Sequence, residues 1–198
     1  MSRREFLAFG LAAAALLGIR PCGARAQSTL PGNSVGVFFE PQGLSHSRQI
    51  VAGVPFFLYV LTNRPLENLY AFELAVQIDP RLRVLSRAAD PASDDILDGD
   101  DQWAVSYRSR CLQSSDLIVL LTYQVVADSP ATDLSVCIVG STPSSLDPPE
   151  PAHIGCPDLT LPIAFFPAYA GCAQVDAVPV ADATLGWGTI KARYRRDG

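Results

Sequence analysis

The sequence predicts an all-β domain built as a two-sheet antiparallel β-sandwich. After residue 33, short runs of β-branched and aromatic residues alternate with clusters of glycine, proline and aspartate, a pattern typical of strands joined by turns. Apolar residues do not recur at helical spacing over any long stretch. Of the 198 residues, 48% are apolar and 18% are charged, so one sizeable core can form within residues 34–194.

The first half of this domain contains four expected strands, at 35–39, 56–61, 69–78 and 82–85. In the first strand, Val35, Val37 and Phe39 share one face. The second is apolar on both faces, which predicts a central position in a sheet. The third alternates large apolar residues with polar or small ones, as a half-buried strand does. It ends before Pro80, because proline cannot donate a hydrogen bond to a neighbouring strand.

The second half contains expected strands at 103–107, 116–126, 133–139 and 187–194. We expect the first two to form a hairpin through a loop that contains Cys111, and the last to close the sheet. Residues 141–168 hold seven prolines and are expected to form a long irregular excursion. A structureless segment of that length is unusual in a compact domain, so we expect it to be functional or held by its cysteines.

Several of these pieces occur in a familiar order. A glycine-led strand runs through 52–61, and residues 72–85 combine an aromatic-x-leucine strand, an aspartate-proline turn and a leucine-x-valine return. Late strands at 117–126 and 188–190 follow. Over most of 34–194 the sequence resembles the cohesin-like modules, the β-sandwiches that bind dockerins in cellulose-degrading assemblies.

The resemblance implies a non-catalytic module that recognises an extracellular protein. Two features depart from the family pattern: Ile78 stands where an aromatic residue is common, and the 141–168 excursion is foreign to a typical cohesin. Carbohydrate-binding modules have a similar topology, and a fold does not decide a function. A polysaccharide is therefore the alternative ligand.

Residues 1–26 are expected to be a cleavable twin-arginine signal peptide. A charged start, an apolar stretch at 8–19 and a small-x-small end form the pattern of a secretory signal. Arg3-Arg4 resembles the twin-arginine motif, and an ordinary Sec signal or an uncleaved anchor are the alternatives. The apolar stretch is shorter than the roughly 20 residues that span a bilayer. After cleavage, a short N-terminal segment at 27–33 would precede the sandwich, and we expect no membrane span and a periplasmic or extracellular location.

The charge of the chain argues against one class of partner. The formal net charge is −5, and without residues 1–26, which hold four arginines and one glutamate, it is near −8. An acidic surface repels phosphate backbones, so nucleic acid is not an expected partner.

Four cysteines remain beyond the leader: Cys111, Cys137, Cys156 and Cys172. An even number in an exported chain favours two disulfide bonds, for which three pairings exist. No two of these cysteines have the two-residue spacing of redox and zinc sites. The preferred pairing is sequential, Cys111 with Cys137 and Cys156 with Cys172.

The acidic segment 94–101, expected to be a loop, is the candidate metal site. Its carboxylates are those of Asp94, Asp95, Asp98, Asp100 and Asp101. Close carboxylates repel one another, and Ca²⁺ would relieve this repulsion through oxygen ligands. The spacing does not match the calcium-loop template, so a solvated acidic turn is the other interpretation. No other cofactor is expected.

Four aromatic residues are candidates for ligand binding, because flat rings can stack on the apolar face of a sugar: Trp103, Tyr107, Tyr169 and Trp187. Aromatic residues of a sandwich also form its core, and the sequence leaves both roles open. Phe165 and Phe166, near Tyr169, are expected to cover one edge of the sandwich or to meet a partner.

Catalysis has little support in the sequence. The two histidines, His46 and His153, fall in expected loops, and no Gly-x-Ser-x-Gly, His-Glu-x-x-His, phosphate-loop or dinucleotide pattern occurs. A Ser–His–acid triad depends on geometry, so surface or structural histidines are expected. We predict an exported, non-enzymatic module for protein recognition, with a carbohydrate-binding module second and a hydrolase third.

Overall fold

The structure is a computed structural model that describes residues 32–63, 65, 68–99, 101–107, 111–112, 117–156 and 161–179. The expected signal peptide and the expected strand at 187–194 lie outside these residues, so both stay predictions. Within the described residues, no helix is long and apolar enough to cross a membrane.

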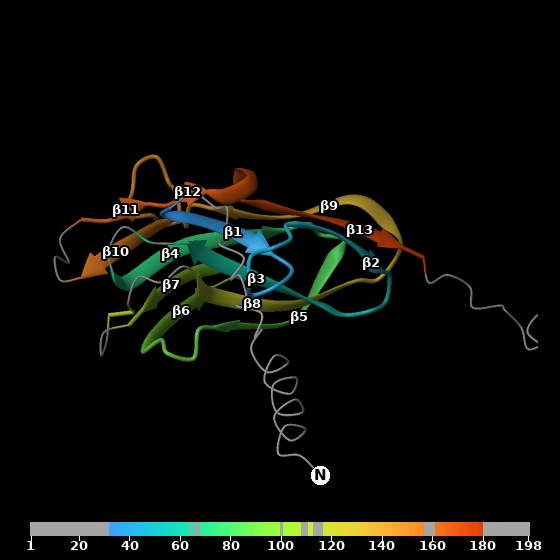
Figure 1. Cartoon of the computed structure of the whole chain (residues 1–198), viewed down its shortest axis with the longest axis horizontal. Coiled ribbons are helices and arrows are strands. Elements are labelled where there is room, and N and C mark those ends of the chain that lie inside the picture. The colour runs from blue at the N-terminus through green and yellow to red at the C-terminus, as the bar shows by residue number, and fades with distance from the viewer. Residues whose placement is uncertain are drawn as a thin grey trace, which may run out of the picture.

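Two β-sheets pack face to face and confirm the predicted sandwich (Figure 1). The first, in spatial order, contains β12 (Phe166–Pro167), β1 (Ser34–Phe38), β3 (Phe56–Asn63), β8 (Ile118–Ala127) and β5 (Leu82–Ala89). The second contains β11 (Ile163–Ala164), β10 (Ala152–Cys156), β4 (Asn68–Ile78), β9 (Ala131–Val139), β13 (Cys172–Val178) and β2 (Ser47–Val51), with β7 (Gln102–Ser106) and β6 (Asp95–Gly99) joined through β4. Strands pair antiparallel except for β1 with β12 and β13 with β2.

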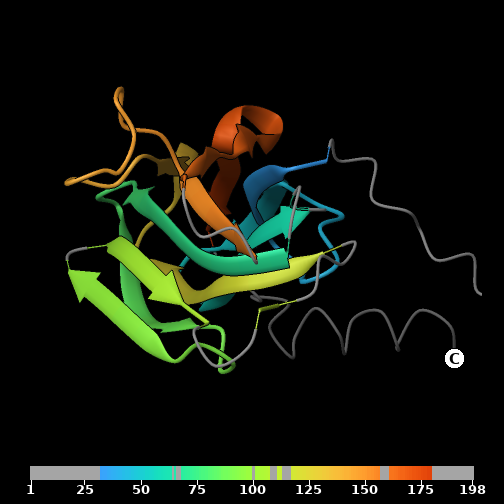
Figure 2. The ribbon, with the colours of Figure 1, turned by 90° about the vertical axis from the view of Figure 1, so that its left-hand side faces the viewer.

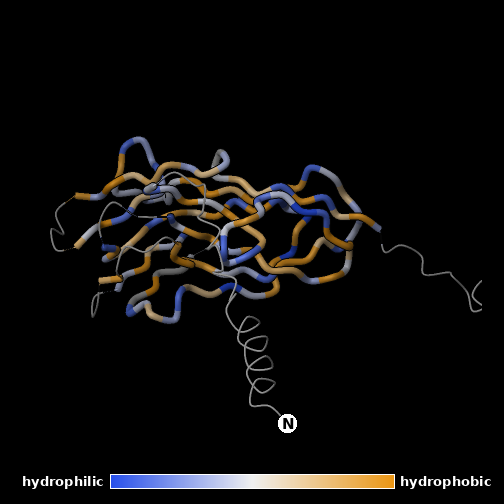
Figure 3. Tube along the Cα trace, in the orientation of Figure 1, coloured by the Kyte–Doolittle hydropathy of each residue, from blue (hydrophilic) through white to orange (hydrophobic). Residues whose placement is uncertain are grey.

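The core lies between the two sheets and follows from the alternation of side chains along each strand. Val35, Val37 and Phe39 point into it from β1 and its end, as predicted. β3 is the middle strand of the first sheet, which confirms its predicted central position. In Figure 3 the hydrophobic stretches run along the strands, and hydrophilic residues are common in the connections at the edges.

β4 is a branch point, and this positions the candidate site. Residues 71–73 pair with both β7 and β10, so these two strands lie on opposite edges of β4. Ala75 pairs with both β7 and β9, so β9 shares with β10 the edge that β7 does not occupy. The chain that connects β9 to β10 therefore leaves the sheet between two strands that flank the same stretch of β4.

Two predicted connections are wrong. The segment 94–101 is not a loop, because β6 pairs with β7 in a hairpin that turns at Asp101, whose φ is 63°. Strands β7 and β8 do not form a hairpin either, because β7 belongs to the second sheet and β8 to the first. Leu112, between β7 and β8, exchanges backbone hydrogen bonds with Leu69 of β4. This part of the connection therefore lies beside β4 and is not a tight turn between two paired strands.

The proline-rich excursion is only partly irregular. It contributes β10 to an edge of β4, and the two-residue strands β11 and β12 to the two sheets. A single turn of 3₁₀ helix, η1 (Ala168–Gly171), follows and packs beside β1 (Figure 2). Backbone pairing with neighbouring strands overrides the low strand propensity of this sequence. Strands β2 and β13 also form where no strand was predicted.

Both disulfide bonds form, but the sequential pairing is wrong. Cys137 bonds to Cys172, and Cys111 bonds to Cys156, with Cα atoms 4.0 Å and 6.3 Å apart. The first pair lies directly opposite in the register of β9 and β13. The second joins the end of β10 to the chain beside Leu112. Strand register, which spacing along the sequence does not show, brings Cys137 to Cys172, and the bridge between Leu112 and Leu69 of β4 brings Cys111 near the end of β10.

Candidate functional site

The outer face of the second sheet carries two cross-strand rows in which alanine and serine predominate. Side chains that alternate with the buried Phe72 and Leu74 of β4 point away from the core. In register, Glu73 lies between Ala104 of β7 and Ala152 of β10. The next row contains Ser106, Ala71 and Ile154. Apart from Ile154, the rows form a floor of short side chains with one carboxylate near its middle.

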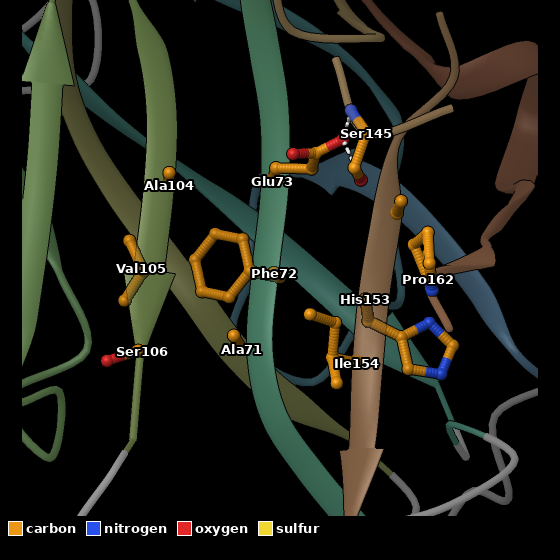
Figure 4. Close-up of a pocket in the computed structure, with 11 residues that line it drawn as sticks. Ala71, Phe72, Glu73, Ala104, Val105, Ser106, Ser145, His153, Ile154 and Pro162 are labelled. Atoms are coloured by element: carbon orange, nitrogen blue, oxygen red, sulfur yellow. Dashed lines mark hydrogen bonds between the residues drawn. The ribbon is translucent and has the colours of Figure 1, made fainter. Parts of the chain in front are cut away.

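Two hollows lie over this floor. The first has a volume of about 240 Å³, and its lining includes Ala71, Ser106, Ile154 and Pro162 (Figure 4). The second has a volume of about 330 Å³, and its lining includes Gly99, Gln102, Ser141, Thr142 and Pro143. Glu73 and Ala104 line both hollows, so the two lie next to each other on one face.

The loop between β9 and β10 separates the hollows. We call residues 141–149 of this loop the strap. One oxygen of Glu73, Oε1, accepts hydrogen bonds from Ser145 N at 2.7 Å and from Ser145 Oγ at 2.6 Å (Figure 4). The same oxygen accepts a third hydrogen bond from Ser144 Oγ at 3.2 Å. Gln102 Oε1 accepts a further hydrogen bond from Thr142 N at 2.7 Å. The strap is thus held on the outer face by polar contacts to β4 and β7.

His153 lies in β10 rather than in the loop expected from the sequence. Its ring is 1% exposed and stacks on Phe165 with centroids 4.4 Å apart. Burial lowers the pKa of His153 to about 4, although a contact with the backbone of Ile163 opposes this shift. Neither ring nitrogen has a hydrogen-bond partner of good geometry. The imidazole is therefore neutral at pH 7 and makes no hydrogen bond to a serine or a carboxylate in the described part of the chain.

The predicted aromatic candidates do not form a common surface. Trp103 and Tyr107 are 2% and 0% exposed and pack in the core, so neither ring is available to a sugar from solvent. Trp103 Nε1 donates a hydrogen bond to the hydroxyl of Tyr123 at 2.6 Å. Tyr169 is exposed, but one face of its ring stacks on the ring of His46, with the ring centroids 3.8 Å apart. Trp187 lies outside the described residues.

The predicted acidic site is divided between a strand and a turn. Asp95 and Asp98 belong to β6, Asp94 precedes it, and Asp100 lies outside the described residues. Asp101 forms an ion pair with Arg87 of β5, with Nη1 2.8 Å from Oδ1. No group of three or more histidine, cysteine, aspartate or glutamate residues in the described part of the chain is placed to hold a metal. Calcium binding stays a prediction.

The sequence did not indicate the residues that now define the site. In the sequence, alternation places Glu73 only on the outward side of a half-buried strand, and Ser144 and Ser145 fall within the proline-rich segment 141–168. The outward alternation on β4 was the available signal for Ala71 and Glu73. The register that aligns Ala104 with Glu73 is a property of the fold and is not readable from the sequence.

Comparison with known proteins supports the fold. No protein-family model matches the chain, and no curated protein matches it. Among solved structures, the chain is similar to the sixth cohesin of scaffoldin B from Acetivibrio cellulolyticus, solved in complex with a mutant Cel5 dockerin. The TM-score is 0.53 at 15% identity, over 75% of this chain and 100% of that one.

Two further cohesins have comparable similarity. The seventh ScaB type I cohesin from Pseudobacteroides cellulosolvens has a TM-score of 0.54 at 10% identity, over 76% of this chain and 96% of that one. A cohesin module of a family 33 glycoside hydrolase from Clostridium perfringens has a TM-score of 0.50 at 6% identity, over 74% and 96%. At these identities the likeness establishes a cohesin-like β-sandwich and leaves the function to the site.

Proposed function

We propose that this protein is a non-catalytic recognition module that binds another protein through the outer face of β4, β7 and β10. The observation that carries the proposal is the pair of adjacent hollows on this face, floored by Ala71 and Ala104 and centred on Glu73. Short side chains leave room for apolar groups of a partner, and a carboxylate among them can fix the orientation of that partner.

The fold adds support for a protein as the partner. The cohesin of Acetivibrio cellulolyticus was solved with a dockerin bound, so this sandwich is compatible with protein recognition. The two disulfide bonds support action outside the cytoplasm, because such bonds persist in oxidising compartments. A polysaccharide fits less well, since two of the four aromatic candidates are buried in the core.

The test is to capture a partner with matched surface variants. Residues 27–198 are immobilised, secreted proteins of the producing organism are passed over them, and a panel of polysaccharides is tested in parallel. Ala104→Arg places a long charged side chain at a residue that lines both hollows, whereas Ala88→Arg places the same charge on an exposed position of β5 in the other sheet.

We expect one protein to be retained by the unaltered chain and by Ala88→Arg, with Ala104→Arg reducing its affinity at least about tenfold. Calorimetry with the purified partner measures that affinity. Retention of polysaccharides alone, or equal retention of the protein by both variants, would contradict the proposal.

A further inference from the structure

The strap is attached to the sheet by polar contacts in its first half. Glu73 accepts hydrogen bonds from Ser144 and Ser145, and Gln102 accepts one from Thr142. Thr142, Pro143, Ser145 and residues 147–149 are exposed, Ser144 and Leu146 are half-buried, and Ser141 is buried. When an exposed group loses a hydrogen bond within the protein, water can form one in its place at little net cost. Water cannot compensate in this way for the exposure of a buried apolar side chain.

The two ends of the strap meet at Gly140. A Cβ atom built on Gly140 would lie 2.3 Å from the carbonyl carbon of Pro149 and 2.5 Å from the nitrogen of Glu150. A side chain is therefore excluded at this position, and the strap is a closed loop of the Ω type. β9 ends before this neck at Val139, and β10 begins after it at Ala152. The strap can leave the face while both strands keep their pairing with β4.

The strap also determines the shape of the face beneath it. Ser145 lines the first hollow, while Ser141, Thr142 and Pro143 line the second. Removing the strap would join the hollows across Glu73 and Ala104, which they share. It would also free the oxygen of Glu73 that Ser144 and Ser145 now occupy.

From this geometry we propose that the strap is a gate, latched on Glu73, that opens independently of the sandwich and converts two hollows into one groove. Its use in binding rests on the proposed function, but its opening needs no partner. In the closed state, Ser144 and Ser145 occupy the acceptor that a partner would otherwise contact. Opening widens access to the floor at Ala104, which is half-exposed in the closed state, and leaves β9 and β10 in place.

The test uses a cysteine reporter on the floor of the groove. Ala104→Cys is introduced into residues 27–198, and its rate of reaction with a small maleimide is measured with both native disulfides intact. Glu73→Ala removes the latch. Glu150→Ala removes an exposed carboxylate beside the neck that is not part of the latch, and serves as the matched control.

We expect Glu73→Ala to accelerate labelling of Ala104→Cys at least about tenfold, and Glu150→Ala to change it less than about twofold. Amide hydrogen exchange on the same variants checks that only the strap moves. Exchange at the Ser145 amide should rise with Glu73→Ala, while amides of β9 and β10 stay protected.

Equal labelling with and without Glu73 would overturn the gate. Faster exchange throughout β9 and β10 would overturn it as well, because Glu73 would then support the strands and not the strap. The labelling experiment tests the gate, and the capture experiment tests the proposed binding of a protein. A negative result in one leaves the result of the other valid, so the two proposals can fail independently.

Discussion

The two outer faces of the sandwich are covered in different ways. On the first sheet, Phe38 and Leu61 point outward yet are 0% and 1% exposed, because Ala168 of η1 and neighbouring apolar side chains pack over them. Gly43, at a φ of 68°, brings another loop close to Leu61. On the second sheet, the strap is held at Glu73 by serine hydroxyls and a backbone amide.

The two covers differ in the kind of contact that holds them: apolar packing over Phe38 and Leu61, and hydrogen bonds between the strap and Glu73. Apolar side chains removed from water stabilise the first cover in proportion to the area they bury. Hydrogen bonds to a half-buried carboxylate make only a modest net contribution of about 1–3 kcal/mol, because unfolding exchanges them for hydrogen bonds to water. The part of the first face around Phe38 and Leu61 is therefore continuous with the folded core, whereas the strap on the second face is held by polar contacts.

The largest expected effect is on the first face. Leu61→Ala should lower the free energy of unfolding by about 2–5 kcal/mol, because it leaves a cavity beneath η1. Urea denaturation measures this change. Leu85→Ala, at a 41% exposed position of the same sheet, is the control and should cost less than about 1 kcal/mol. A loss below that value for Leu61→Ala would mean that the cover on this face is not part of the core.

Acid should act on the second sheet through His153. Its pKa is about 4 in the folded chain against 6.5 for the ordinary side chain, so the unfolded state binds a proton first as the pH falls. The free energy of unfolding is therefore unaffected by the titration of His153 above pH 6.5 and falls by about 3 kcal/mol as the pH decreases towards 4.

Urea denaturation from pH 7 to pH 4 measures this dependence. His153→Phe keeps the stack on Phe165 and should remove the contribution of His153, whereas His46→Phe should retain it. If the unaltered chain and His153→Phe lose the same stability over this range, His153 is not the group responsible.

Sequence reasoning succeeded where the information is local. Alternation along 35–39 and 69–78 predicted which residues of β1 and β4 face the core. It failed where partners are distant: β7 and β8 join different sheets, and Cys137 pairs with Cys172. The latch itself joins residues 71 or 72 positions apart, Glu73 with Ser144 and Ser145. No local pattern predicts such a contact, because strand register and loop path create it.

The smallest expected effect is that of the latch on stability. Glu73→Ala should lower the free energy of unfolding by only about 1–2 kcal/mol, because its partners regain hydrogen bonds to water. The same substitution should nevertheless produce the large change in labelling of Ala104→Cys described above. A stability loss comparable to that of Leu61→Ala would remove the distinction between the two faces.

The recognition surface is tested most directly by an amide-exchange footprint of the captured complex. The account predicts protection on β4, β7 and β10 on partner binding, altered exchange in the strap, and no change in η1 or β5. Protection confined to η1, β1 and β5, with the strap unchanged, would contradict it.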